Sequence, residues 1–276
     1  MKNRIPIKAA ASLGLAVCPP LQASSATNEF FAMDNAIRDV EAIADKADLL
    51  RDLGYDGVTW RPGYTAQAAK VMKAHDVKIH ALMMNLTVSK TEDATALPLG
   101  DIEALEGTDA ILWVQLTRKG GDDTDAVRAL RRLNDVAQPM GLRIAIYPHI
   151  NNQVETLEEA MRVATLVDDD NVGVSLTLCH QLKKQGMQDL EALLKTALPK
   201  LFLVQVSGAE TGDTTKMGWD KLIQPLGQGD YDVGAIFRIL KNLDYTDPIG
   251  VIGFGMRQPA KEHLKASITY WQNAWK

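Results

Sequence analysis

Two histidines are the clearest candidates for chemistry in this sequence of 276 residues. His149 follows the apolar run Ile144–Tyr147, and His180 follows the apolar run Val172–Leu178. An unperturbed imidazole titrates near neutral pH, so such a pair can serve as acid and base. If the two runs are neighbouring parallel strands, both side chains lie at the same end of a sheet. We therefore expect His149 and His180 to share one catalytic site.

The segment between the two histidines predicts a helix that covers this sheet. Thr156 and Glu159 form a capping-box pattern at its start, and apolar side chains then repeat at helical spacing. The repeating positions are Leu157, Ala160, Met161, Ala164 and Val167. A strand, a helix and a second strand make the unit from which parallel sheets are built.

The same alternation continues along the rest of the chain. The predicted strands are Glu29–Met33, Asp56–Trp60, Lys78–Leu86, Ala110–Leu116, Ile144–Tyr147, Val172–Leu178, Leu201–Val206 and Ile249–Phe254. A doubly wound open sheet also alternates, but it usually carries a Gly-rich phosphate turn after its first strand, where this chain has Asp34-Asn35-Ala36. About 250 residues suffice for a (β/α)8 barrel. We predict an α/β fold, a TIM barrel, as a single domain over residues 27–276.

Residues 1–26 are typical of a secretory signal peptide. The start is basic, the run Ala9–Val17 is apolar, and Ser24-Ser25-Ala26 supplies small residues for cleavage. We expect export to the periplasm or out of the cell, with no transmembrane segment in the mature chain. A lipobox-like run ends at Cys18, but Val17 stands where a small residue is usual, so lipid anchoring is the less favoured alternative.

Composition narrows the choice of partners. The net charge is −5, and lysines and arginines are scattered among acids, so we predict no nucleic-acid partner. Cys179 is the single cysteine after cleavage, which excludes an internal disulfide. It could be a nucleophile, but free cysteines are commonly buried as small hydrophobic residues, and we favour that reading.

A barrel of this kind builds its active site at the carboxyl ends of its strands. Besides the histidines, this rule selects candidate substrate-binding residues: Trp60, Arg61, Asn85, Tyr147, Asn152, Gln205, Ser207 and Lys216. The set is rich in hydrogen-bonding groups and poor in carboxylates, and Trp60 could stack on a sugar ring. The structural alternatives are a hydrogen-bonded histidine, a packed Trp60 and a solvated Lys216. We expect the remaining histidines, His75, His80 and His263, to be structural or to lie on the surface.

Several segments, in this order and spacing, resemble the sugar isomerase/epimerase family with a xylose-isomerase-like TIM barrel. They are GYDGVTW, IAIYPH, VETLEEAMRVA, NVGVSLTLCH, LIQPLGQGDYDV and PIGVIGFG. The resemblance covers most of residues 30–275 and looks closest to exported bacterial members. It implies a small-molecule carbohydrate as ligand, and isomerisation or epimerisation by proton transfer next to a sugar carbonyl.

The resemblance also implies one divalent metal ion, Mn²⁺ or a relative, between Glu, Asp, His and Glu at the ends of strands five to eight. The matching positions hold, at or near, Tyr147, Thr177, Gln205 and Gly253, and only the histidine of the family's Asp-Thr-Gly-His run is kept, as His180. Neutral side chains bind Mn²⁺ or Mg²⁺ poorly. We therefore predict no metal and no other cofactor. The alternative is a metal ion (Mn, Zn or Mg) held by the two histidines with Glu155 or water.

Three functions remain open from the sequence. The first is a sugar isomerase or epimerase with His149 and His180 as acid and base. A keto-sugar lyase or hydratase needs the same proton abstraction next to a carbonyl. A sugar-binding barrel without catalysis would explain the missing metal ligands.

Overall fold

The computed structural model of this chain describes residues 28–91 and 96–275. The predicted leader, its cleavage site and Cys18 lie outside the described residues.

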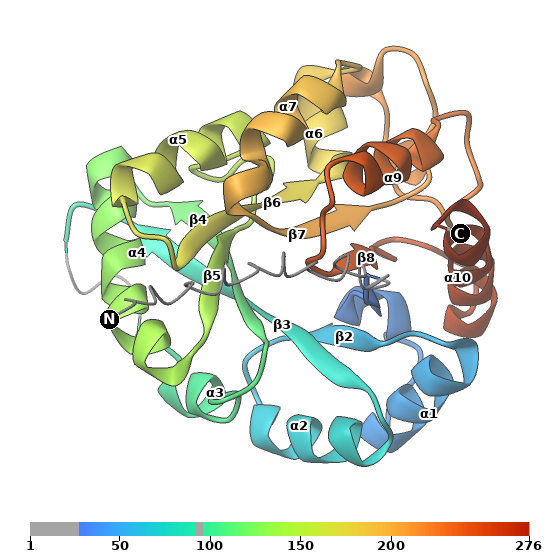
Figure 1. The fold of residues 1–276 in the computed structure, drawn as a ribbon, viewed down its shortest axis with the longest axis horizontal. Coiled ribbons are helices and arrows are strands. Elements are labelled where there is room, and N and C mark those ends of the chain that lie inside the picture. Colours follow the sequence, from blue (N-terminus) through green and yellow to red (C-terminus); the bar gives the residue numbers. More distant parts are fainter. Residues whose placement is uncertain (1–27, 92–95, 276) are drawn as a thin grey trace, which may run out of the picture.

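Parallel strands close into a barrel in which each strand pairs with its neighbours in the chain (Figure 1). The strands are β1 Phe30–Ala32, β2 Gly57–Trp60, β3 Lys78–Val88, β4 Ile111–Arg118, β5 Arg143–Ile146, β6 Val172–Thr177, β7 Leu201–Val206 and β8 Ile249–Val251. The barrel closes where β1 pairs with β8 through Phe31 and Gly250. The predicted (β/α)8 TIM barrel is confirmed.

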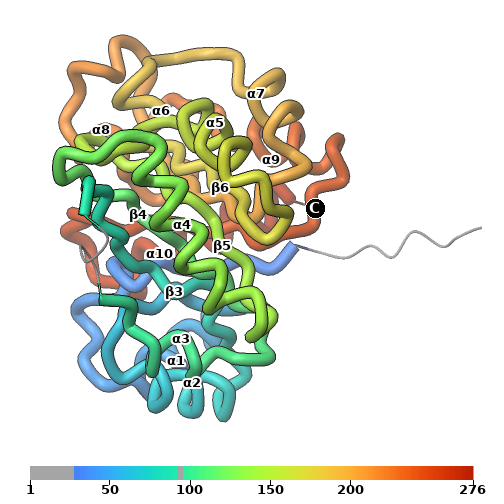
Figure 2. Tube along the Cα trace, turned by 90° about the vertical axis from the view of Figure 1, so that its left-hand side faces the viewer, coloured from blue at the N-terminus to red at the C-terminus, as the bar shows by residue number. Residues whose placement is uncertain are grey.

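Helices surround the barrel (Figure 1). They are α1 Ile43–Leu53, α2 Thr65–Ala74, α3 Leu99–Glu103, α4 Asp123–Ala137, α5 Leu157–Val167, α6 Leu178–Gln185, α7 Leu190–Ala197, α8 Trp219–Leu222, α9 Val233–Asn242 and α10 Ala260–Trp275. Short 3-10 helices are η1 Asp34–Ile37, η2 Gln138–Met140, η3 Leu198–Lys200 and η4 Thr214–Lys216. In the turned view, α1, α2 and α3 lie on one side of the barrel and α5, α6 and α7 on the other (Figure 2). In the described part of the chain, no helix has the length and apolar character needed to cross a bilayer.

The helix between the two histidines, α5, forms as its sequence pattern predicts. Leu157, Ala160, Ala164 and Val167 are buried against the barrel. The Thr156 hydroxyl accepts a hydrogen bond from the backbone N–H of Glu159, which caps the helix. The Glu159 carboxylate accepts from the backbone N–H of Glu155, one residue before the partner expected of a capping box.

Three differences from the sequence prediction concern the carboxyl ends of the strands. β6 ends at Thr177 and passes directly into α6, so His180 lies in the first turn of a helix. The apolar run continues across this junction, which is why periodicity placed no helix there. A second unpredicted helix, α8, lies in the long segment after β7. β8 ends at Val251, earlier than the predicted Phe254.

Strand glycines make room for large rings of neighbouring strands. A Cβ atom on Gly250 would lie 2.1 Å from the Phe31 ring, and one on Gly173 would lie 2.6 Å from the Phe202 ring. A Cβ atom on Gly57 would lie 2.4 Å from the His80 ring. Such close approach to a neighbouring side chain is a place where a strand needs glycine.

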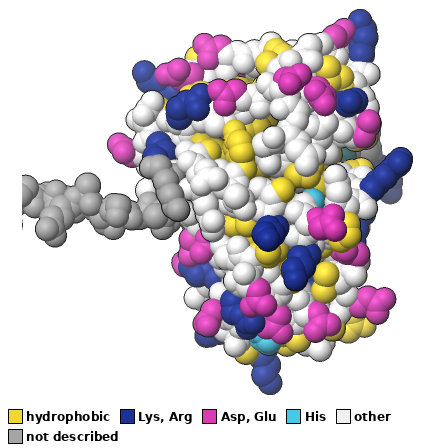
Figure 3. All heavy atoms as spheres, turned by 90° about the vertical axis from the view of Figure 1, so that its right-hand side faces the viewer, with side chains coloured by type: hydrophobic (Ala, Val, Ile, Leu, Met, Phe, Trp, Pro, Cys, Tyr) yellow, Lys and Arg dark blue, Asp and Glu magenta, His cyan; other side chains and the backbone are white. Residues whose placement is uncertain are grey.

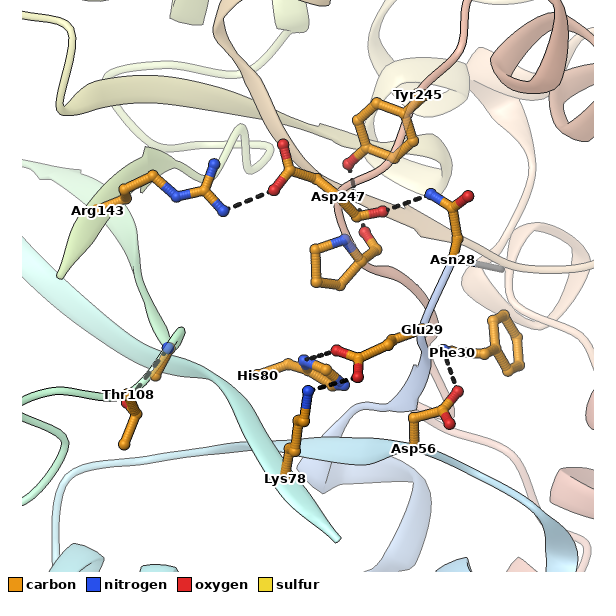
Figure 4. Close-up of polar contacts among 12 residues, drawn as sticks. Asn28, Glu29, Phe30, Asp56, Lys78, His80, Thr108, Arg143, Tyr245 and Asp247 are labelled. Carbon is orange, nitrogen blue, oxygen red and sulfur yellow. Dashed lines mark hydrogen bonds and ion pairs between the residues drawn. The ribbon is translucent and has the colours of Figure 1, made fainter. Parts of the chain in front are cut away.

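A polar network lies at the amino ends of the strands (Figure 4). Lys78 Nζ lies 2.5 Å from Glu29 Oε1, and His80 Nδ1 lies 3.7 Å from Glu29 Oε2. Across the same end, Arg143 Nη2 lies 2.6 Å from Asp247 Oδ1. This is the end of a TIM barrel that usually serves stability.

The face of the molecule in Figure 3 carries basic and acidic side chains interspersed.

Candidate active site

A cavity of about 390 Å³ opens at the carboxyl ends of the strands. Its lining comes from the segments after β1, β2, β5, β6, β7 and β8 and from β3 and β4. A larger cavity, of about 710 Å³, lies near the amino ends, between α2 and residues 104–110. We place the candidate active site in the first cavity because it brings both predicted histidines together at the functional end of the barrel.

His149 and His180 meet in this cavity as their positions after adjacent strands predict. Their ring centroids are 4.0 Å apart, with the ring planes inclined by 44°. His149 is half-buried, and His180 is buried. The predicted pair therefore forms one contact within a single cavity.

Ile150 hydrogen-bonds to both imidazoles and so fixes their tautomers. His149 Nδ1 lies 2.8 Å from the Ile150 carbonyl oxygen, which can only accept, so this nitrogen carries the proton. The backbone N–H of Ile150 donates to His180 Nδ1 at 3.4 Å, so that nitrogen carries none. His149 therefore offers a lone pair at Nε2, and His180 offers an N–H at Nε2.

Burial lowers the pKa of both histidines. The pKa of His149 lies below its ordinary value of 6.5 because burial disfavours the imidazolium, an effect that the Ile150 carbonyl partly opposes. Burial and then the nearby His149 lower the pKa of His180 to about 3. Both rings are thus neutral at pH 7, which preserves the complementary tautomers.

The Tyr147 ring packs against both histidines. Its ring stacks on Trp113 with centroids 4.1 Å apart and an interplanar angle of 9°. It meets both imidazoles in T-shaped arrangements, with ring centroids 5.8 Å apart for His149 and 6.0 Å apart for His180. Burial raises the pKa of the phenol, and Gln115 hydrogen-bonds to it, so Tyr147 is a neutral hydroxyl at the base of the cavity.

Arg61 is the other predicted residue that lines the cavity. Its Nε donates to Asp34 Oδ2 at 2.6 Å. The Asp34 carboxylate also accepts a hydrogen bond from the Thr59 hydroxyl, whose oxygen lies 3.4 Å from Oδ1. Asp34 is largely buried and so holds the guanidinium at a fixed place beside the opening.

The other predicted binding residues do not line the cavity. The Trp60 indole N–H donates to the Gly63 carbonyl at 3.2 Å. Lys216 is paired with Asp213 at 2.7 Å, and its side chain is 84% exposed. Asn85 is exposed on β3.

Three predicted polar residues are directed into the protein. The Ser207 hydroxyl donates to the Leu222 carbonyl at 2.8 Å. The Gln205 amide donates to the Val206 carbonyl at 2.8 Å, and its Oε1 has no hydrogen-bond partner among the described residues. The buried Nδ2 of Asn152 likewise finds none there.

Sequence reasoning missed three charged or aromatic residues that line the cavity: Arg38, Trp219 and Phe254. Trp219 begins α8, and its ring meets the His180 ring in a T-shaped arrangement with centroids 5.1 Å apart. Trp219 thus gives the cavity the aromatic side chain that was expected from Trp60. Arg38 and Phe254 follow β1 and β8, where the strand-end rule could have found them. Nothing in the sequence pattern marked Trp219, because its place depends on the course of a long segment.

The residues at the family's metal positions do not fit a divalent cation. Tyr147 is a buried neutral phenol, and Thr177 and Gln205 offer a hydroxyl and an amide without any carboxylate. Hard cations prefer several charged oxygen ligands. Across residues 28–91 and 96–275, no three His, Cys, Asp or Glu side chains are grouped closely enough to hold a metal ion. The two histidines and Glu155 therefore do not form such a group, and the Glu155 carboxylate is paired with Lys184.

Cys179 is fully buried beside His180, and burial raises its thiol pKa to about 12. A thiol with this pKa is a poor nucleophile at neutral pH. The interpretation of Cys179 as a small buried side chain agrees with this environment.

Comparisons with known proteins agree with the fold and with the resemblance seen in the sequence. Inosose isomerase from Bacillus subtilis is 29% identical over 128 residues, which are 46% of this chain and 45% of that protein. The chain thus matches under half the length of this curated relative. The crystal structure of the IOLI protein with a bound zinc atom has a TM-score of 0.74 at 20% identity, over 90% of this chain and 98% of that one.

A second solved structure, 3-keto-D-glucoside 4-epimerase from Escherichia coli, has a TM-score of 0.70 at 16% identity, over 89% of this chain and 99% of that one. At these identities, both structures show a common fold. The model of the xylose isomerase-like TIM barrel matches residues 47–274. Because this match covers most of the sequence, the chain belongs to the xylose isomerase-like TIM barrel family.

Proposed function

We propose that the protein isomerises a sugar by proton transfer next to a carbonyl, with His149 as base and without the family's metal ion. The observation that carries this proposal is the pair of imidazoles 4.0 Å apart, held in complementary tautomers by Ile150. The names of two relatives, an inosose isomerase and a 3-keto-D-glucoside 4-epimerase, support the reaction class. With the predicted leader, this reaction would take place after export.

The tautomers assign different roles to the two rings. His149 Nε2 takes the proton from the carbon next to the carbonyl, and the C–H electron pair becomes the C=C bond of an enediolate. The carbonyl electron pair moves to the oxygen, where the Nε2–H of His180 donates a hydrogen bond. A neutral imidazole is suited to this donor role, because its second nitrogen is held by the Ile150 N–H.

One base on one face favours isomerisation over epimerisation. His149 can return its proton to the neighbouring carbon on the same face while the proton of the hydroxyl on the first carbon moves to the former carbonyl oxygen, which converts an aldose into a ketose or the reverse. Epimerisation requires delivery of the proton to the opposite face. Among the described residues that line the cavity, the only histidines, tyrosines or acids are His149, His180 and Tyr147. Of these, His180 is assigned as the hydrogen-bond donor and Tyr147 is a neutral phenol, which leaves His149 as the single base.

Proton exchange in D₂O tests this reaction directly. The purified protein is incubated with candidate aldoses and ketoses, either with EDTA or with added Mn²⁺, and C–H exchange is followed by NMR. We expect exchange next to the carbonyl in the presence of EDTA, and a loss of about 10²- to 10⁴-fold in His149→Ala. His75→Ala is the matched control, because His75 lies at the end of α2 and is paired with Asp48.

The other outcomes separate the rival functions. Exchange that requires Mn²⁺ would overturn the metal-free mechanism. Sugar binding without exchange would favour a binding barrel, an alternative that the neutral residues at the metal positions support. Loss of water from a keto-sugar would identify a lyase or hydratase.

A further inference from the structure

The cavity has an unusual charge for a protein that is acidic overall. The net charge of the chain is −5, yet no Asp or Glu is among the described residues that line the cavity. Two arginines, Arg38 and Arg61, do line it. A concave site that carries charge of one sign concentrates ligands of the opposite sign.

Arg61 is positioned with part of its guanidinium unused. Asp34 accepts from its Nε at 2.6 Å, while its two Nη atoms have no hydrogen-bond partner among the described residues. A guanidinium has several donors in a planar fork and can bind a carboxylate or phosphate through two parallel hydrogen bonds. The contact with Asp34 therefore orients Arg61 without exhausting its donors.

Arg38 supplies a charge that no carboxylate neutralises within residues 28–91 and 96–275. It follows the short helix η1, and its Cζ lies 5.5 Å from the centroid of the Phe254 ring. Phe254 also lines the cavity, so the contact places the guanidinium beside the opening. Since Asp34 offsets Arg61, the pair of arginines leaves about one positive charge in excess.

The arginines and the histidines come from opposite sides of the barrel. Arg38 and Arg61 follow the adjacent strands β1 and β2, and His149 and His180 follow β5 and β6. In a closed barrel with this strand order, these two pairs of strands lie across from each other. A ligand that contacts both pairs must span the opening. The cavity is at the small end of the usual range for ligand sites, roughly 300–1,000 Å³, which suits a monosaccharide.

We propose that the substrate is an anionic monosaccharide whose negative group binds Arg38 and Arg61 while its carbonyl faces His149 and His180. The excess of about one positive charge matches a sugar carboxylate, as in a uronic acid, better than a doubly charged phosphate ester. A uronic acid carries its carboxylate and its carbonyl at opposite ends of the chain, as the opposed pairs of side chains require. This inference rests on the proposed function for the role of the histidines, but the anion site itself does not.

Binding measurements on the complete protein test the anion site apart from catalysis. Calorimetry would compare D-glucuronate and D-galacturonate with D-glucose, D-galactose and a hexose phosphate. We expect the uronates to bind at least tenfold more tightly than the neutral sugars. Arg38→Gln and Arg61→Gln should each weaken uronate binding by about 10- to 100-fold. Neither substitution should change the affinity for neutral sugars. Arg238→Gln is the matched control, because Arg238 lies on α9 and pairs with Asp232.

The outcomes distinguish the two proposals. Uronate binding that depends on both arginines, without C–H exchange, would support the anion site and overturn the proposed isomerisation. Exchange on neutral sugars that Arg38→Gln and Arg61→Gln leave unchanged would overturn the anion site and retain the isomerase. Tighter binding of the hexose phosphate would support an anion site but assign phosphate as the group. Failure of every anionic sugar to bind would overturn the inference.

Discussion

At the scale of single residues, the two histidines differ because the backbone of one residue, Ile150, hydrogen-bonds to both. Ile150 accepts from His149 Nδ1 at 2.8 Å and donates to His180 Nδ1 at 3.4 Å. The same side-chain type thus offers a lone pair at Nε2 in one position and an N–H at Nε2 in the other. The difference between the two tautomers comes from backbone groups, so it cannot be predicted from the residue type at position 150.

The lowered pKa of His149 predicts the pH dependence of proton exchange. The base must be neutral, and burial places its pKa below 6.5. As pH falls, the rate should therefore stay constant through pH 7 and decline only below about 6.5. Initial exchange rates between acidic and neutral pH would measure this limb. An acidic limb centred above pH 7 would contradict the assignment of His149 as base.

Two tryptophans offer a matched test of the sugar-binding surface. Trp219 lines the cavity and contacts His180, whereas Trp60 lies outside the lining. Trp219→Ala should weaken binding of the best ligand by about tenfold, as expected for loss of an aromatic contact of roughly 1–2 kcal/mol. Trp60→Ala should leave the affinity unchanged. Equal effects of both substitutions in calorimetry would argue against a specific role for Trp219.

At the scale of elements, glycines decide how closely the strands pack their side chains. The position of a Cβ on Gly250 lies 2.1 Å from the ring of Phe31, which is fully buried and has no room to move aside. The pairing of Phe31 with Gly250 also closes the barrel between β1 and β8. This contact therefore serves both packing and closure.

Gly250→Ala should destabilise the protein by about 1–3 kcal/mol, because the added methyl group overpacks the barrel. Urea unfolding followed by circular dichroism measures the change. Gly100→Ala is the control, since a Cβ on Gly100 in α3 meets no atom within 4 Å. Alanine there should be neutral or slightly stabilising. A similar loss of stability in both variants would contradict the packing argument.

At the scale of the whole molecule, the two ends of the barrel have separate tasks. The carboxyl ends carry the cavity with His149 and His180, while the amino ends carry the ion pairs of Lys78 with Glu29 and Arg143 with Asp247 (Figure 4). His80 lies at this second end, buried against Gly57, and its Nε2 has no partner among the described residues. It contributes to stability and not to the candidate site.

His80 should make the fold sensitive to acid. Burial lowers its pKa in the folded protein to about 4, whereas an unfolded histidine titrates near 6.5. Between these values the unfolded chain binds the extra proton, so stability falls as pH decreases, by up to about 1.4 kcal/mol per pH unit. Urea unfolding between pH 7 and about 4 tests this. His80→Gln should reduce the slope, and an unchanged slope would contradict the prediction.

The sequence alone determined the barrel and the end of the barrel at which His149 and His180 meet. Apolar runs alternating with helical patterns are local properties, and the two histidines follow two of those runs directly. Parallel pairing then brings their ends together, as the 4.0 Å contact shows. The junction of β6 and α6 escaped prediction because a buried strand and a buried helix turn share the same apolar composition.

Only the tertiary structure decided which other residues face the cavity. Trp219 reaches His180 because the long segment after β7 folds back over the barrel. Trp60 instead hydrogen-bonds to Gly63 and does not line the cavity. Arg38 and Arg61 face the same opening because β1 and β2 are neighbours in a closed sheet. Such positions depend on the course of loops and on contacts between distant segments, which residue type and spacing do not encode.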